Sequence, residues 1–221
     1  YWKFCCELAN NGLNVLGIGD CPYFELREEL RNSLTEYYRV NNLENYDEVY
    51  RAVAFFIHKY GKIDFLESNN EYWLEHDAAL RTDFNILSGY RLRQMKGVKF
   101  KSQMKKAYAK AGIKTAKHCL VKSLNGCKKF IGEVGYPVIV KPDNGVGANN
   151  TYKINNEEEL KEFLKTSPQR YIMEEYIDAL VCSYDAVVDS KGNPVFETGL
   201  REMLSLMDTV NNGENSLYFY P

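Results

Sequence analysis

Helical patterns alternate with short apolar runs along the first 90 residues, and this alternation limits the chain to a few architectures. A helix is predicted from Tyr46 to Tyr60, because its apolar side chains recur at helical spacing and Gly61 can end it. Apolar runs at 14–18 and 63–67 are predicted as strands. This order is typical of a parallel sheet with helical crossovers. We therefore expect an α/β fold in which residues 1–90 form a Rossmann-like domain.

The chain opens in a helical pattern at residues 1–10, and Asn11-Gly12 ends that pattern before the first strand. A further helix is expected at about 71–84. Domains of this α/β kind usually begin with a strand. We therefore expect one strand and its loop to precede residue 1.

Composition and charge exclude several classes of function. The formal net charge is -2, and no dense basic run interleaves with aromatic residues, so nucleic acid is not an expected partner. No apolar run approaches the roughly 20 residues that cross a bilayer, and no signal-type start is present, so we expect a cytoplasmic protein without membrane contact. The six cysteines form no C-x-x-C pair and have no histidine at ligand spacing, which predicts neither a disulfide framework nor a metal site.

A second unit follows a basic, irregular stretch at 89–99 that we interpret as a linker. The patterns beyond it predict an α+β domain over 91–221, divided into a first subdomain at 91–168 and the start of a second at 169–221. Asn156 and Glu159 form a capping pair for one of its helices. The predicted helices lie at 102–111, 124–134 and around 157–164, and the predicted strands at 115–121, 136–142, 151–154, 170–174, 181–188 and 194–198.

Two common nucleotide signatures are absent. The segment Gly17-Ile18-Gly19-Asp20-Cys21-Pro22 has the first two glycines of a dinucleotide fingerprint, but a proline stands in place of the third. The glycine-bearing turn at 143–150 lacks the Gly-Lys-Ser/Thr ending of a P-loop. Neither NAD nor Walker-type ATP binding is therefore expected.

An ordered set of features in the second unit points elsewhere. A lysine, Lys101, precedes a helix that ends in Ala111-Gly112-Ile113. There follow Gly135-Tyr136-Pro137-Val138-Ile139-Val140-Lys141-Pro142, the glycine turn, Met173-Glu174-Glu175-Tyr176-Ile177 and Ser183-Tyr184-Asp185. This order and spelling resemble the ATP-grasp superfamily, whose members include biotin carboxylase, D-alanine ligase and the large subunit of carbamoyl phosphate synthetase. The resemblance covers nearly the whole chain. It implies a Rossmann-like domain followed by two α+β subdomains that hold ATP.

The resemblance also implies a set of binding residues. Lys101 and Lys141 match the two family lysines that contact the nucleotide phosphates. Gly145 and Gly147, with Ala148, match the loop that closes over the phosphates. The segment joining the subdomains is matched by Glu174, Glu175, Tyr176 and Ile177; it pairs with the adenine edge, and the side chain of Glu174 or Glu175 takes the amino group. Asp185 matches a weakly defined acidic position and is a candidate for ribose, since Val181 and Cys182 occupy the stretch where many members carry an acid.

The magnesium ligands of the family are a glutamate and a later Glu-x-Asn triplet, and no such triplet follows residue 175. Glu67-Ser68-Asn69 has the spelling but sits in the first domain, so we interpret it as coincidence or at most a substrate-side contact. The chain is then either a piece of a longer protein or a degenerate member. No catalytic residue is assigned.

The resemblance implies Mg²⁺ with ATP, a small carboxylate as second substrate, and a homodimer as one possible assembly. The expected activity is a carboxylate–amine or carboxylate–thiol ligase that forms an acylphosphate. A module that binds ATP without turnover and an interaction domain without a ligand remain the alternatives.

Overall fold

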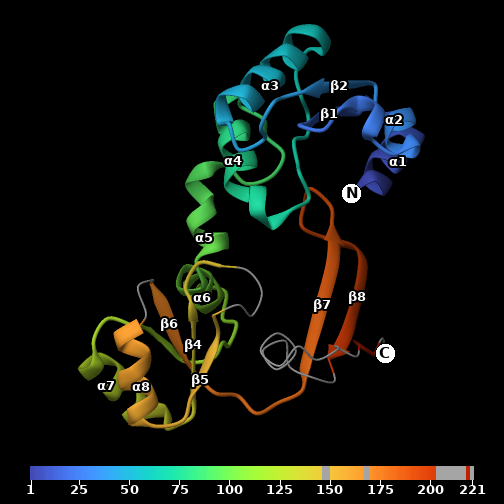
Figure 1. Ribbon diagram of the computed structural model, residues 1–221. Coiled ribbons are helices and arrows are strands. Elements are labelled where there is room, and N and C mark those ends of the chain that lie inside the picture. The colour runs from blue at the N-terminus through green and yellow to red at the C-terminus, as the bar shows by residue number, and fades with distance from the viewer. Residues whose placement is uncertain (146–149, 167–169, 203–217, 220–221) are drawn as a thin grey trace. The chain divides into compact units, whose positions relative to one another are not determined.

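The computed structural model describes residues 1–145, 150–166, 170–202 and 218–219. The chain divides into two compact units, Tyr1–Met95 and Lys96–Pro221 (Figure 1). Unit 1 combines helices with one small described sheet and unit 2 combines helices with two, in agreement with the predicted mixture of α/β and α+β structure. None of the described helices is both long enough and apolar enough to cross a membrane.

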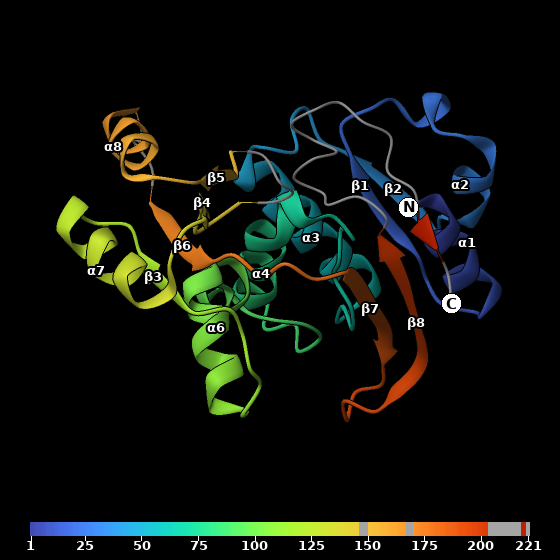
Figure 2. The ribbon, with the colours of Figure 1, turned by 90° about the horizontal axis from the view of Figure 1, so that it is seen from below.

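Unit 1 contains a parallel pair of strands with helices around it. Strands β1 and β2 pair in parallel, with Leu16 opposite Glu36 and Gly19 opposite Arg39, and they lie side by side in Figure 2. The described elements are α1 (Trp2–Asn10), β1 (Leu16–Gly19), η1 (Tyr23–Glu25), α2 (Glu28–Ser33), β2 (Glu36–Arg39), α3 (Tyr46–Tyr60), η2 (Glu71–Trp73) and α4 (Leu74–Asp83).

The predicted helix at 46–60 is confirmed residue for residue as α3. Val49, Ala52, Val53 and Phe56 form its buried stripe, and Gly61 ends it with φ 84°, a left-handed conformation that suits glycine. The first helix and the strand after it are confirmed within about two residues of their expected bounds.

The predicted strand at 63–67 is wrong, since this segment forms no strand and pairs with no other described segment. Its Ile63 and Leu66 instead line a cavity of about 220 Å³ together with Leu16 and Ile18 of β1. A strand is stabilised by the ladder that it joins, and this apolar run joins none of the described strands. In place of 63–67, the partner of β1 is β2, which the sequence does not predict because Glu36-Tyr37-Tyr38-Arg39 lacks a clear apolar alternation.

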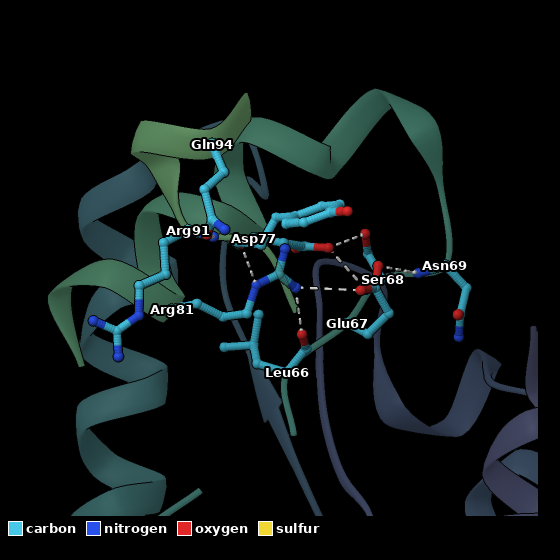
Figure 3. A network of polar contacts seen from close by, with 9 residues as sticks. Leu66, Glu67, Ser68, Asn69, Asp77, Arg81, Arg91 and Gln94 are labelled. Carbon is cyan, nitrogen blue, oxygen red and sulfur yellow. Dashed lines mark hydrogen bonds and ion pairs between the residues drawn. The ribbon is translucent and has the colours of Figure 1, made fainter. Parts of the chain in front are cut away.

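A buried arginine ties the unpaired segment to helix α4 (Figure 3). Arg81 is 2% exposed and donates from Nη1 to the carbonyl of Leu66 at 2.7 Å and from Nε to the carbonyl of Tyr90 at 2.9 Å. Its Nη1 also lies 3.2 Å from Glu67 Oε2. Beside it, Ser68 donates through both its amide and its hydroxyl to Asp77 Oδ2. The Glu67-Ser68-Asn69 sequence therefore has a structural use in unit 1.

The boundary between the two units lies inside 89–99, the stretch interpreted as a linker, and residues 92–99 of it are helical. The residues form η3 (Leu92–Gln94) and α5 (Met95–Lys99), and the side chain of Gln94 accepts a hydrogen bond from the Arg91 amide, as in a capping box. The remaining described elements are α6 (Lys101–Lys110), β3 (His118–Leu120), α7 (Leu124–Val134), β4 (Val138–Pro142), β5 (Tyr152–Ile154), α8 (Glu157–Thr166), β6 (Tyr171–Glu175), β7 (Val181–Val188), β8 (Pro194–Glu202) and β9 (Tyr218–Phe219).

Four of these strands form an antiparallel sheet in the order β3-β6-β4-β5. Alternate residues of β4 and β6 bury Val138, Val140, Tyr171 and Met173 against helices α7 and α8, which supply the other half of a ten-residue core. The predicted capping pair of α8 is confirmed: the amide of Glu159 donates to Asn156 Oδ1, and Asn156 Nδ2 donates back to Glu159 Oε1. The residues between, including Lys141 and Glu174, point to the other face of the sheet, which we call the charged face.

The remaining strands form a separate sheet in the order β7-β8-β9. The predicted hairpin is confirmed, with Val181 opposite Glu202 and Val187 opposite Phe196, and β7 and β8 run side by side in Figures 1 and 2. The turn between them is closed by Asp189, whose side chain accepts from the amides of Lys191 and Asn193.

Candidate functional site

One buried carboxylate fixes helix α6 against the sheet. Asp143 follows β4 directly and is 0% exposed. Its Oδ1 accepts from the amide of Ser102 and its Oδ2 from the Ser102 hydroxyl, each at 2.8 Å. Its Oδ2 also lies 2.7 Å from Nε of Arg170, just before β6. Three parts of the chain therefore meet at Asp143, and the first turn of α6 is held at the ends of β4 and β6.

Lys101 is the first residue of α6 and lies beside the start of the glycine-bearing turn. Its amide donates to the carbonyl of Asp143 at 2.8 Å, and its Nζ donates to the carbonyl of Gly145 at 2.8 Å. Gly145 has φ 155°, a conformation that residues with a side chain rarely adopt. Lys101 is thus brought close to the first glycine of its predicted set. The other two loop positions, Gly147 and Ala148, lie outside the described residues.

Lys141 points from β4 onto the charged face and meets Glu174 of β6. Its Nζ lies 2.8 Å from Glu174 Oε2, and Nζ of Lys105, one helical turn after Lys101, lies 3.1 Å from Glu174 Oε1. The side chains of Glu174, Lys105 and Lys141 are 9%, 12% and 27% exposed. The two lysines therefore clasp one nearly buried carboxylate.

The environment of Glu174 keeps it ionised. Burial by itself raises the pKa of its carboxyl, but the hydrogen bonds and charges of Lys141 and Lys105 outweigh burial and bring that pKa below the ordinary value. Oε1 is buried, and its contact among the described residues is Lys105 Nζ at 3.1 Å, which leaves part of its acceptor capacity unused. Glu174 therefore retains an acceptor that a donor on this face could use.

The other residues of the predicted segment joining the subdomains have different surroundings. Glu175 Oε1 accepts from the amide of Lys117 at 2.7 Å, and the Glu175 amide donates to the Lys117 carbonyl, so this carboxylate is used at the edge of β3. Tyr176 and Ile177 follow β6 and are 38% and 59% exposed. The ring of Tyr176 is covered by Lys153 of β5, whose Nζ lies 4.1 Å from the ring centroid. Of the two predicted acids, Glu174 is the one whose carboxylate contacts the ammonium groups of Lys105 and Lys141.

Asp185 lies on exposed strand β7, where its Oδ2 accepts from the Ser183 hydroxyl at 2.8 Å. No described contact joins it to the residues of the charged face. Its predicted role as a ribose acceptor stays a prediction.

Four residues of this arrangement do not stand out in the sequence. Asp143 lies in a polar turn, and neither Ser102 nor Arg170, which hold it, belongs to a recognisable motif. Lys105 is also missed by sequence reasoning, although its spacing of four from Lys101 places both on one face of a helix. That spacing is the one signal that could have found it.

The chemistry of the charged face follows from its charges. Lys105 and Lys141 carry two positive charges against one carboxylate, and Lys101 adds a third ammonium group at the start of the same helix as Lys105. Ammonium groups of this kind stabilise a polyanion at a desolvated surface. Within the described ranges, no group of three or more His, Cys, Asp or Glu side chains could hold a metal ion.

Comparisons with known proteins agree on the fold of this region. Residues 98–198 match the family model described as carbamoyl-phosphate synthase L chain, ATP binding domain. A carbamoyl phosphate synthase large chain of Sulfurisphaera tokodaii is 34% identical over 98 residues, which are 42% of this chain and 9% of that protein. D-alanine--D-alanine ligase B of Clostridium perfringens is 40% identical over 62 residues, which are 28% of this chain and 20% of the ligase. The matches thus span a small part of either relative.

Solved structures share the fold over a longer stretch. A biotin carboxylase complex from Campylobacter jejuni superposes with a TM-score of 0.68 at 17% identity, covering 93% of this chain and 50% of that one. N5-carboxyaminoimidazole synthetase from Staphylococcus aureus, complexed with ADP, gives a TM-score of 0.65 at 20% identity, covering 96% of this chain and 57% of the synthetase. The chain therefore corresponds to about half the length of these enzymes.

Proposed function

We propose that this chain is a member of the ATP-grasp superfamily and that it binds ATP on the charged face of unit 2 as the nucleotide-binding part of an ATP-dependent ligase. The single observation that carries the proposal is the cluster of Lys105, Lys141 and Glu174 on a sheet face that α7 and α8 leave uncovered. The match of residues 98–198 to an ATP-binding domain supports it.

The phosphates would be held by Lys101 and Lys141. Both ammonium groups are attached to rigid elements, since Lys101 begins a helix fixed by Asp143 and Lys141 lies in a strand paired on both sides. Phosphoryl transfer depends mainly on positioning and on neutralising charge, so rigid cations are the contribution expected of this part of the protein. The loop residues Gly145, Gly147 and Ala148 would supply backbone amides to the same phosphates.

The adenine would lie near the end of β6. Glu174 Oε1 is buried beside Lys105 Nζ and can accept a second hydrogen bond, so it suits the exocyclic amino group of adenine. Backbone groups of Glu175, Tyr176 and Ile177 would pair with the ring edge, and Asp185 with the ribose. Guanine carries a carbonyl at the position of that amino group, and its oxygen would face a carboxylate, so the arrangement favours adenine.

The reaction would join a small carboxylate to an amine or thiol. The γ-phosphate would pass to the carboxylate to give an acylphosphate, and the nucleophile would then displace phosphate. Mg²⁺ bound with ATP would neutralise part of the phosphate charge. The relatives named above are ligases and synthases, which favours turnover over passive ATP binding.

We include a homodimer and a cytoplasmic location in the proposal. One similar solved structure, from Hydrogenobacter thermophilus, is a biotin carboxylase domain dimer, which supports the homodimer. All six cysteines of the present chain are free, which suits a reducing compartment such as the cytoplasm.

Titration calorimetry with ATP tests the binding step. We expect Lys141→Ala to raise the Kd for ATP about tenfold or more, because a charge-assisted contact to phosphate is lost. Lys129→Ala, which removes an exposed lysine from the α7 side of the same sheet, is the matched control and should change the Kd less than about twofold. Equal affinities for the two variants would contradict the proposed site. GTP should bind more weakly than ATP.

A further inference from the structure

Glu174 has two cationic partners in this structure, and they are not equivalent. Lys141 Nζ makes the 2.8 Å contact and its side chain is 27% exposed, whereas Lys105 Nζ is 3.1 Å away on a side chain that is 12% exposed. Lys105 Nζ also donates to the carbonyl of Ala116 at 3.2 Å. Lys105 is therefore the more buried and more constrained of the two, and Lys141 has more room to turn away.

Under the proposed function, the ammonium group of Lys141 has two possible anionic partners. In this structure Lys141 neutralises Glu174, but in a nucleotide complex it would neutralise phosphate. When Lys141 turns to the phosphates, a nearly buried carboxylate loses its closest counter-ion. Removing one partner from a buried ion pair is costly, because the remaining charge is left without compensation. Nucleotide binding at this site thus depends on what else neutralises Glu174.

We propose, resting on the proposed function, that Lys105 is a positioning residue: it stays with Glu174 as a permanent counter-ion and so allows Lys141 to exchange the carboxylate for a nucleotide phosphate. Lys105 need not touch the nucleotide. It holds Glu174 charged and in place, with Oε1 toward the adenine amino group. The charged face then needs three lysines, of which two serve the phosphates and one serves the carboxylate.

The other titratable groups around Glu174 do not replace Lys105. His118 of β3 is paired across the strand with Glu174, and Lys153 of β5 is paired with Ile139, so both side chains start from the same face of the sheet. No described ion pair joins either to Glu174, and Lys153 instead lies over the ring of Tyr176. Below Glu174, the core face is apolar. Lys105 and Lys141 are thus the two cations that contact this carboxylate among the described residues.

The test compares ATP binding by the full chain and by Lys105→Gln, Lys105→Arg and Lys106→Gln. Glutamine removes the charge but can still donate to the Ala116 carbonyl. Lys106 is exposed on the same helix, so Lys106→Gln is a control with the same change of charge. We expect Lys105→Gln to raise the Kd for ATP about tenfold, Lys105→Arg to restore most of the affinity, and Lys106→Gln to stay within about twofold of the unsubstituted chain. Lys105→Met, which keeps the aliphatic stem, replaces Lys105→Gln if that variant does not fold.

Proton uptake distinguishes this role from simple packing. In Lys105→Gln, ATP binding draws Lys141 away and leaves Glu174 buried without a cation, and burial then raises the pKa of its carboxyl. Part of the population should take up a proton on binding, so the affinity of the variant should fall as pH rises from about 7.5 to about 8.5. Calorimetry in two buffers of different ionisation enthalpy measures this uptake, and the unsubstituted chain corrects for protons released by ATP.

Each outcome bears on one of the two proposals. If the unsubstituted chain does not bind ATP, the proposed function fails. If it binds ATP but Lys105→Gln and Lys106→Gln have the same Kd, the role of Lys105 is wrong while the ATP site stands. Weak binding by Lys105→Gln with no additional proton uptake also overturns the inference, because Lys105 would then support the site by packing alone.

Discussion

Unit 1 and the four-stranded sheet of unit 2 combine helices and strands in different ways. In unit 2, helices α7 and α8 cover one face of the sheet and close a core of ten buried residues. In unit 1, one cluster holds three buried residues, Val49, Val53 and Leu80, and a cavity of about 220 Å³ lies beside it. The comparison shows a larger buried cluster in the unit whose sheet strands are all paired, although a cavity of about 350 Å³ lined by Ile154, Phe163 and Tyr171 borders that cluster as well.

Truncating a buried side chain should give the largest difference in stability loss between the two regions. Leu160 is 0% exposed in the core of unit 2, so Leu160→Ala leaves a new cavity and should lower the free energy of unfolding by about 3 kcal/mol. Leu66 already borders a cavity in unit 1, so Leu66→Ala should cost only about 1 kcal/mol. Urea unfolding followed by circular dichroism measures both. Equal losses would mean that the two cores are equally well packed.

The polar network of unit 1 should matter more to that unit than its apolar packing does. Arg81→Gln removes donors from the carbonyls of Leu66 and Tyr90 and a charge from Glu67, and should lower the free energy of unfolding by about 2 kcal/mol. Both tryptophans, Trp2 and Trp73, lie in unit 1, so tryptophan fluorescence follows it directly.

The control for this network is Arg51→Gln, at an exposed position of α3, which should change stability by no more than about 0.5 kcal/mol. If Arg81→Gln lowers the free energy of unfolding no more than Arg51→Gln does, the contacts of Arg81 do not stabilise unit 1.

The smallest expected effect is a difference in sign. Val49→Ile adds a methyl group next to the unit 1 cavity and should stabilise the protein by about 0.5 kcal/mol. Val140→Ile adds the same group to the filled core of unit 2 and should destabilise it by about 1 kcal/mol. Thermal unfolding of the two variants checks the signs, and stabilisation by both would mean that unit 2 also has unfilled space.

Local patterns predicted most helices and the antiparallel strands of unit 2, because the residues that determine these elements lie close together in the sequence. The stripe of α3, the Asn156–Glu159 cap of α8 and the hairpin around Asp189 all depend on residues within a few turns of each other. The two failures in unit 1 concern pairing instead. The run at 63–67 has the composition of a strand but forms no ladder with the described strands, and β2 pairs with β1 although it has little of the expected pattern.

The candidate site divides in the same way. The resemblance carried by Lys101, Lys141 and Glu174 selected residues that the fold brings to one region of unit 2. Asp143 and Lys105 were not predicted, since their importance comes from contacts with residues far along the chain, Arg170 and Glu174. Long-range ion pairs of this kind leave no periodic trace in a sequence.

Within the described part of the chain, strand β1 pairs along one edge only, and its other side borders the cavity lined by Ile63 and Leu66. Backbone amides and carbonyls on an unpaired edge can recruit any extended chain that comes near, including another molecule of the same protein. Concentrated samples should therefore lose material by slow self-association that starts at unit 1. Covering that edge with a charged or proline substitution should slow this loss.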